Sequence, residues 1–154
     1  MAGVGKLDVE VEVKTNADKF WGSIRDSATV FPKALPHQYK TIQVLEGDGK
    51  SVGSVRLIHY AEASSIVTFA KEKIDAVDEG KKTVCYSIID GDLLKFYKSF
   101  KATLTVSPKE GEGSLVKWES EFVKASDEIP DPNIIRDFAV DNFAKLDAYL
   151  TATA

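Results

Sequence analysis

Apolar and charged residues alternate strictly near the start of the chain. From 7 to 13 every odd-numbered residue is Leu or Val, and every even-numbered residue between them is Asp or Glu. A period of two with β-branched side chains predicts a strand with one buried face. The charged face of that strand is expected to meet the solvent.

Two short helices are expected after this strand. Thr15 or Asn16 can cap the first, in which apolar residues recur at helical spacing. Pro32 and Pro36 limit the second, near residues 27–35, to about two turns, because proline cannot continue a helix.

A long region of alternating patterns follows the helices. Turn sequences such as DEGKK, DGD and PKEGEG divide it into short runs. We expect six further strands, at residues 39–45, 54–62, 65–77, 82–90, 94–108 and 115–124. Consecutive strands joined by short turns indicate an antiparallel meander.

The last part of the chain returns to helical spacing. Its apolar stripe runs through Ile134, Ile135, Phe138, Asn142, Leu146 and either Tyr149 or Leu150. Asp131 before Pro132 is a typical helix start, and about 20 residues of helix span about 30 Å. The pattern therefore predicts an α+β fold, with a sheet of about seven antiparallel strands, two short helices between strands one and two, and a long C-terminal helix across the sheet.

Composition narrows the class of protein. The 154 residues suffice for a single domain, 1–154, and the net charge of −4 argues against a nucleic-acid partner, which usually needs a basic patch. Cys85 is the only cysteine, and we see no signal-peptide pattern and no apolar stretch of membrane-spanning length. We expect a cytoplasmic monomer that does not insert into membranes.

The glycine-rich stretch EGDGKSVG contains the Gly-Lys-Ser triplet of phosphate-binding loops. A Walker loop needs a further glycine where this chain has Val44, and a helix where an alternating strand is expected. We therefore interpret Gly47, Gly49 and Gly53 as residues of a hairpin turn and not as a nucleotide site.

Several stretches together resemble one plant family. They are FPKALP after the first helix, EGDGKSVGSVRLI between two strands, IDAVDEGKKTVCYSIIDGDLL, LVKWESEF and DFAVDNFAKLDAYL. In this order they are similar to the birch pollen allergen (Bet v I) superfamily, and most of all to its major latex protein branch. The chain departs from pathogenesis-related members at residues 50–52, which are Lys-Ser-Val here.

The resemblance implies a helix-grip fold, in which a curved seven-stranded sheet surrounds the C-terminal helix. It also implies an internal apolar cavity that binds small amphipathic ligands such as hormones, flavonoids, sterols or lipids. Such proteins are cytosolic and linked to defence or stress, and they need no cofactor and no metal.

Strand alternation and the helix stripe select the side chains that face the interior. We expect the ligand to contact Ile24, Phe31, Leu35, Ile58, Tyr60, Val67, Phe69, Val84, Tyr86, Ile88, Phe100, Leu104, Trp118, Ser120, Phe122, Ile135, Phe138 and Asn142. The same residues could fill a sealed core, and only the resemblance favours a pocket. Asn142 is the best internal sign, because a buried amide without a partner costs about 1–3 kcal/mol. The short helices and residues 62–65 are expected to form the mouth.

Other functions stay open. Relatives that form alkaloids suggest an enzyme of cyclisation or isomerisation, in which the inward groups would be Lys98, Tyr60 and Tyr86. A weak ribonuclease would use Glu46, Asp147 and Tyr149. A stress protein that acts through partner proteins would have only a vestigial cavity. A nucleophilic triad or a zinc site is not expected, because His37, His59 and Cys85 form no known pattern.

Overall fold

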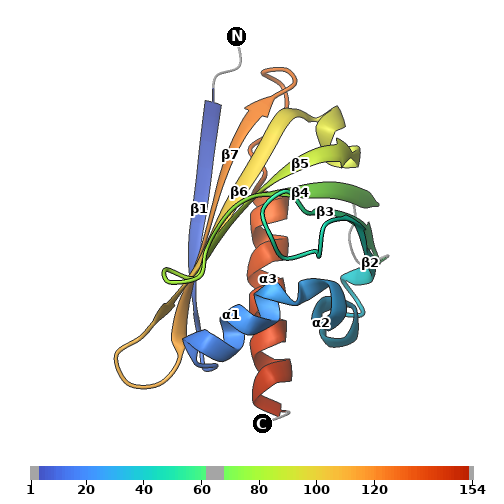
Figure 1. Cartoon of the computed structure of the whole chain (residues 1–154). Coiled ribbons are helices and arrows are strands. Elements are labelled where there is room, and N and C mark those ends of the chain that lie inside the picture. Colours follow the sequence, from blue (N-terminus) through green and yellow to red (C-terminus); the bar gives the residue numbers. More distant parts are fainter. Residues whose placement is uncertain (1–3, 62–67, 153–154) are drawn as a thin grey trace.

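A curved sheet and three helices make up the described part of the chain, which is residues 4–61 and 68–152 of a computed structural model (Figure 1). The strands are β1 (Val4–Val13), β2 (Tyr39–Glu46), β3 (Val55–Tyr60), β4 (Phe69–Asp78), β5 (Thr83–Gly91), β6 (Tyr97–Pro108) and β7 (Ser114–Lys124). The helices are α1 (Ala17–Arg25), α2 (Ser27–Ala34) and α3 (Asn133–Ala152), and Asp92–Lys95 form a short 3₁₀ helix, η1.

All strand pairs in the described sheet are antiparallel, and the strand order is β1-β7-β6-β5-β4-β3-β2. β2 to β7 form the expected meander, and β1 pairs with β7 to extend the sheet. Figure 1 shows the sheet curving around α3, with α1 and α2 at one end. The predicted helix-grip fold is therefore confirmed.

The start of one strand differs clearly from the prediction. β6 begins at Tyr97 instead of residue 94, because η1 intervenes after Gly91. Gly91 has a φ of 124°, and a Cβ there would lie 2.5 Å from the backbone oxygen of Phe69, so only glycine fits this turn. The described part of β4 begins at Phe69; residues 62–67, where the strand and the mouth were expected, lie outside the described residues.

The core lies between the concave face of the sheet and α3. Buried side chains recur along α3 at Ala139, Phe143, Leu146 and Leu150. Ile134, which the predicted stripe included, is 57% exposed, because it stands about 100° around the helix from its neighbour Ile135. No described helix is both long and apolar enough to cross a membrane.

Asp147 ties α3 to the turn between β1 and α1. Its carboxylate accepts hydrogen bonds from the backbone N–H groups of Lys14 and Thr15 at 2.9–3.1 Å, and from the Thr15 hydroxyl at 2.6 Å. Burial alone would raise the pKa of Asp147, but these hydrogen bonds hold it below its ordinary value. The carboxylate is thus engaged in holding the fold.

This tie gives a pH-dependent prediction. A folded-state pKa below the unfolded value of about 4 adds stability that is complete above that pH and is lost as the pH falls through the folded pKa. We expect Asp147→Asn to lower the free energy of unfolding at pH 7 by about 1–3 kcal/mol and to flatten the acid limb of a melting-temperature profile. Asp137→Asn, at an exposed site on the same helix, is the control. Identical acid limbs for wild type and Asp147→Asn would contradict the role of the tie.

Candidate functional site

A cavity of about 90 Å³ lies between the sheet and the helices. Most of its wall is apolar and comes from the sheet, with α1, α2 and α3 closing the remaining sides. The lining residues are Ile24, Arg25, Ser27, Phe31, Tyr39, Ile42, Gly49, Arg56, Ile58, Glu72, Ile74, Val84, Tyr86, Leu104, Trp118, Ala139, Asn142 and Phe143. Strand alternation explains this set, because every second residue of β3, β4 and β5 points inward.

One side of the cavity carries a buried ion pair. Arg56 on β3 donates through Nη2 to the Glu72 carboxylate on β4 at 2.7 Å, and through Nη1 to the Ser27 hydroxyl at the start of α2. The two charged side chains are only 11% and 9% exposed. Burial raises the pKa of Glu72, and the attraction of Arg56 opposes that rise. The pair is therefore charge-balanced but costly to leave incomplete.

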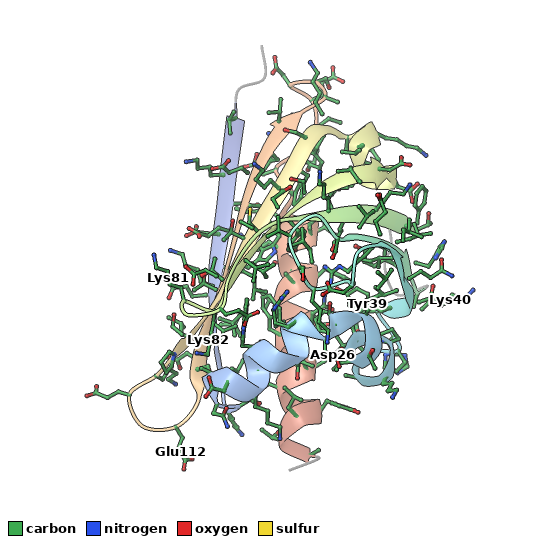
Figure 2. The ribbon with its side chains drawn as sticks, in the orientation of Figure 1. Asp26, Tyr39, Lys40, Lys81, Lys82 and Glu112 are labelled. Carbon is green, nitrogen blue, oxygen red and sulfur yellow. The ribbon has the colours of Figure 1, made fainter. Side chains whose placement is uncertain are left out.

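A second polar group comes from α3 and β2. Asn142 donates through Nδ2 to the Tyr39 hydroxyl at 2.7 Å, and both residues are buried. Figure 2 shows Tyr39 on the inner side of β2, while its neighbour Lys40 points outward. Burial, reinforced by the charge of Glu72, raises the pKa of Tyr39 well above its ordinary value, so this phenol keeps its proton.

Two residues of the cavity wall carry polar atoms without a protein partner. Among the buried side-chain atoms of the described residues, three lack a hydrogen bond: Arg56 Nε, Asn142 Oδ1 and Gln38 Oε1. Arg56 and Asn142 line the cavity, whereas Gln38 does not. The sequence-based expectation that Asn142 needs a partner is thus half met, because its amide nitrogen is bonded and its oxygen is not.

About half of the predicted site residues meet at the cavity. These are Ile24, Phe31, Ile58, Val84, Tyr86, Leu104, Trp118 and Asn142, together with Gly49 of the glycine-rich loop. They come from α1, α2, β3, β5, β6, β7 and α3. The alternation of the strands therefore brings these distant parts of the sequence together as expected.

A group of predicted residues lies next to the cavity without lining it. The rings of Tyr60 and Phe138 pack against Tyr39 at centroid distances of 5.6 and 5.8 Å. Leu35 belongs to the same buried cluster. These side chains continue the apolar wall beyond Tyr39, and Ile135 at the start of α3 is partly buried.

Other predicted residues pack elsewhere in the core. Phe100 and Phe122 surround Tyr97 at ring-centroid distances of 6.0 and 5.6 Å, and Ile88 is buried with them in the main core. The Ser120 hydroxyl donates to the Leu7 carbonyl at 3.1 Å, so it is already engaged.

The predicted inward position of Phe69 is wrong. Phe69 pairs with His59, which is exposed, and their rings lie 6.5 Å apart. Ala70, Glu72 and Ile74 are the inward residues of β4. Val67, the other residue predicted for this strand, lies outside the described residues.

The sequence analysis missed nine of the lining residues. They are Arg25, Ser27, Tyr39, Ile42, Arg56, Glu72, Ile74, Ala139 and Phe143. Arg56 has the same strand parity as Ile58 and Tyr60, so that signal was available. Glu72 was missed because taking Phe69 as inward assigns Glu72 to the outer face, since a shift of one residue exchanges the two faces of a strand.

The glycine-rich loop binds its own carboxylate. Asp48 Oδ1 accepts hydrogen bonds from the backbone N–H groups of Lys50 and Ser51 at 2.8 and 2.7 Å, and these bonds lower the pKa of Asp48. Gly47, Gly49 and Gly53 all have positive φ. The N–H groups that would hold a phosphate are thus already occupied, which agrees with the interpretation as a turn.

The proposed catalytic base is not in the cavity. Lys98 is exposed and does not line the cavity, so it does not supply the base that the enzyme alternative would need. Tyr60 and Tyr86 are held protonated because burial raises the pKa of both phenols, and the charge of Glu72 adds to the effect. Of the groups suggested for a ribonuclease, Asp147 holds the fold and Glu46 is exposed.

Comparisons with known proteins agree with the fold. Residues 2–153 match the Pathogenesis-related protein Bet v 1 family. MLP-like protein 423 of Arabidopsis thaliana is 56% identical over 146 residues, which cover 95% of this chain and 94% of that protein.

Solved structures extend the comparison. The crystal structure of ginseng major latex-like protein 151 from Panax ginseng has a TM-score of 0.85 at 28% identity, and the match covers 95% of this chain and 97% of that one. Norcoclaurine synthase from Thalictrum flavum has a TM-score of 0.73 at 21% identity over 94% of both chains, a likeness of fold alone. The family match over nearly the whole chain and the 56% identity show that this chain is a major latex protein-like member of the Pathogenesis-related protein Bet v 1 family.

Proposed function

We propose that the protein binds a small amphipathic molecule in the cavity between the sheet and α3. The observation that carries this proposal is the polar side of an otherwise apolar cavity, where Arg56 Nε and Asn142 Oδ1 have no protein partner. A sealed core rarely leaves buried polar atoms unpaired, whereas small-molecule sites combine apolar walls with a few placed polar groups.

The proposed ligands are hormones, flavonoids, sterols or lipids, the classes that the family resemblance of the sequence suggests. Binding would be driven by burial of their apolar surface, at about 25 cal/mol per Å². The family name Pathogenesis-related supports a role in defence or stress. We propose action as a cytoplasmic monomer without a nucleic-acid partner.

The cavity has to open to admit such a ligand. Its volume of about 90 Å³ is below the roughly 300–1,000 Å³ of typical ligand sites. Two contacts hold the junction of α1 and α2 to the glycine-rich loop: Lys50 pairs with Asp26 at 3.5 Å, and Arg25 donates to the Lys50 carbonyl. The pair of Lys50 and Asp26 is exposed and therefore weak, so we infer that the cavity opens at this junction.

Cavity catalysis is the second candidate, and one observation favours it. Glu72 is a buried carboxyl whose pKa is raised by burial, as in a general acid or base. Its carboxylate is also bound by Arg56 at 2.7 Å, which restrains proton transfer to a substrate. Binding is therefore the function that this arrangement supports best.

A filled cavity tests the binding proposal. Ala139 lines the cavity, whereas Ala144 is exposed on the same helix, so Ala139→Leu and Ala144→Leu form a matched pair. With the neutral fluorescent probe N-phenyl-1-naphthylamine, we expect saturable binding to wild type and to Ala144→Leu. For Ala139→Leu we expect at least about tenfold weaker binding, equivalent to about 1.4 kcal/mol.

Two results would contradict the proposal. One is equal affinity in all three proteins, which would place the probe elsewhere. The other is failure of wild type to bind this probe or any member of a panel of hormones, flavonoids, sterols and lipids. Native mass spectrometry of protein from its own tissue is an independent test, because it would identify any ligand that was carried through purification.

A further inference from the structure

Two residues on the polar side of the cavity each carry one buried polar atom without a protein partner. Arg56 Nε–H is a donor and Asn142 Oδ1 is an acceptor, and both atoms are buried. The rest of each side chain is already engaged: Arg56 with Glu72 and Ser27, and Asn142 with Tyr39. These bonds fix the two side chains in the wall of the cavity.

The two groups belong to one polar site. Tyr39 is hydrogen-bonded to Asn142 at 2.7 Å, and it is close enough to Glu72 and Arg56 for their charges to act on its phenol. All four residues line the same cavity of about 90 Å³. Arg56 and Asn142 therefore lie on the wall of one small cavity, where a single ligand would contact both residues.

The charges that line the cavity are balanced. Arg56 is neutralised by Glu72 at 2.7 Å, and Arg25, the other charged lining residue, is paired with Glu79 at 2.8 Å. A carboxylate ligand beside this pair would add an uncompensated charge and would face Glu72. Burying an unpaired charge is far more costly than burying a hydrogen-bonded neutral group.

We propose that the cavity selects uncharged ligands whose polar end both accepts a hydrogen bond from Arg56 Nε–H and donates one to Asn142 Oδ1. A hydroxyl group is the simplest chemistry that does both. This selection rests on the proposed binding function and specifies its ligand class. It excludes pure hydrocarbons, which leave both atoms unpaired, and carboxylates, which upset the charge balance.

Three single-ring probes test the selection: phenol, benzene and benzoate at pH 7. One ring needs less expansion of a cavity of about 90 Å³ than a larger probe does. Titrations followed by protein NMR measure each affinity and show which residues respond. We expect phenol to bind wild type at least about tenfold more tightly than benzene or benzoate, with shifts around Asn142 and Tyr39.

Variants separate recognition from stability. Asn142→Leu removes the free acceptor, and we expect it to reduce the preference for phenol over benzene at least about threefold. Gln38→Leu is the matched control, because Gln38 is also a buried amide with a free oxygen but does not line the cavity. Its preference is expected to equal that of wild type. If Asn142→Leu does not fold, the double variant Arg56→Met with Glu72→Leu removes the other half of the site and is expected to lose the preference.

The outcomes distinguish this inference from the proposed function. Equal binding of phenol and benzene, or tighter binding of benzoate, would overturn the selection but leave a binding cavity in place. Failure of all three probes in a protein that also rejects larger neutral ligands would overturn both. An equal loss of preference in Gln38→Leu and Asn142→Leu would assign the effect to general packing and overturn the selection.

Discussion

Replacing Arg56 alone with methionine is expected to lower the free energy of unfolding by about 3–5 kcal/mol. Arg56 Nη2 and the Glu72 carboxylate are 2.7 Å apart, with side chains only 11% and 9% exposed. Without the guanidinium the carboxylate stays buried with no opposite charge, and this, more than the lost attraction, is the source of the destabilisation. Urea unfolding at pH 7 measures the loss.

The double variant reverses the expected sign. Arg56→Met with Glu72→Leu removes both charges, and pairs replaced by apolar residues of similar size are often as stable as the original or more so. We expect its free energy of unfolding to be no more than about 1 kcal/mol below that of wild type, or to exceed it. The surface pair of Lys6 and Glu121, at 3.7 Å with side chains 76% and 55% exposed, is the control. Lys6→Met is expected to cost no more than about 1 kcal/mol.

The pH dependence of Arg56→Met gives a further check. Burial raises the pKa of Glu72, and removal of Arg56 takes away the attraction that opposes the rise. A carboxyl whose folded-state pKa lies above its unfolded value destabilises the folded protein as the pH rises through that range. The loss in free energy of unfolding of Arg56→Met relative to wild type is therefore expected to shrink as the pH falls. A single variant as stable as wild type, or a constant deficit at all pH values, would show that Glu72 is not an unpaired buried charge in this variant.

Local patterns predicted the fold well because the strands are half-buried. In a strand such as β1, with charges on one face and Val on the other, the sequence alone shows which face is buried. β4 carries a weaker signal: its inward residues are Ala70, Glu72 and Ile74, and the ring of Phe69 points the other way. A large apolar residue on the outer face and a carboxylate on the inner face together mimic a strand shifted by one residue.

The cavity was harder to predict than the fold for two physical reasons. Its polar side is built from charged residues that pair across β3 and β4, and the pattern of one strand does not reveal a partner on the next. Its volume depends on how closely Phe143 and Ala139 of α3 approach the sheet, which no periodicity encodes. Asn142 was the exception, because an amide within an apolar helix stripe needs a partner wherever the helix lies.

Phe143 connects the volume of the cavity to the stability of the protein. Its ring is 4% exposed, lines the cavity and packs against Phe20 at a centroid distance of 6.3 Å. We expect Phe143→Ala to lower the free energy of unfolding by about 3–5 kcal/mol, as for other buried aromatic residues. The deleted ring also adds its space to the cavity of about 90 Å³. N-phenyl-1-naphthylamine is therefore expected to bind about tenfold more tightly, equivalent to about 1.4 kcal/mol.

Phe122→Ala separates these two effects. Phe122 is 2% exposed and packs against Tyr97, but it does not line the cavity. Phe122→Ala is also expected to lower the free energy of unfolding by about 3–5 kcal/mol, but without any gain in probe affinity. Equal gains in both variants would mean that the probe binds wherever the core is loosened. A gain in Phe143→Ala alone would mean that the small volume of this cavity, and not a lack of apolar surface, limits the ligands that the protein accepts.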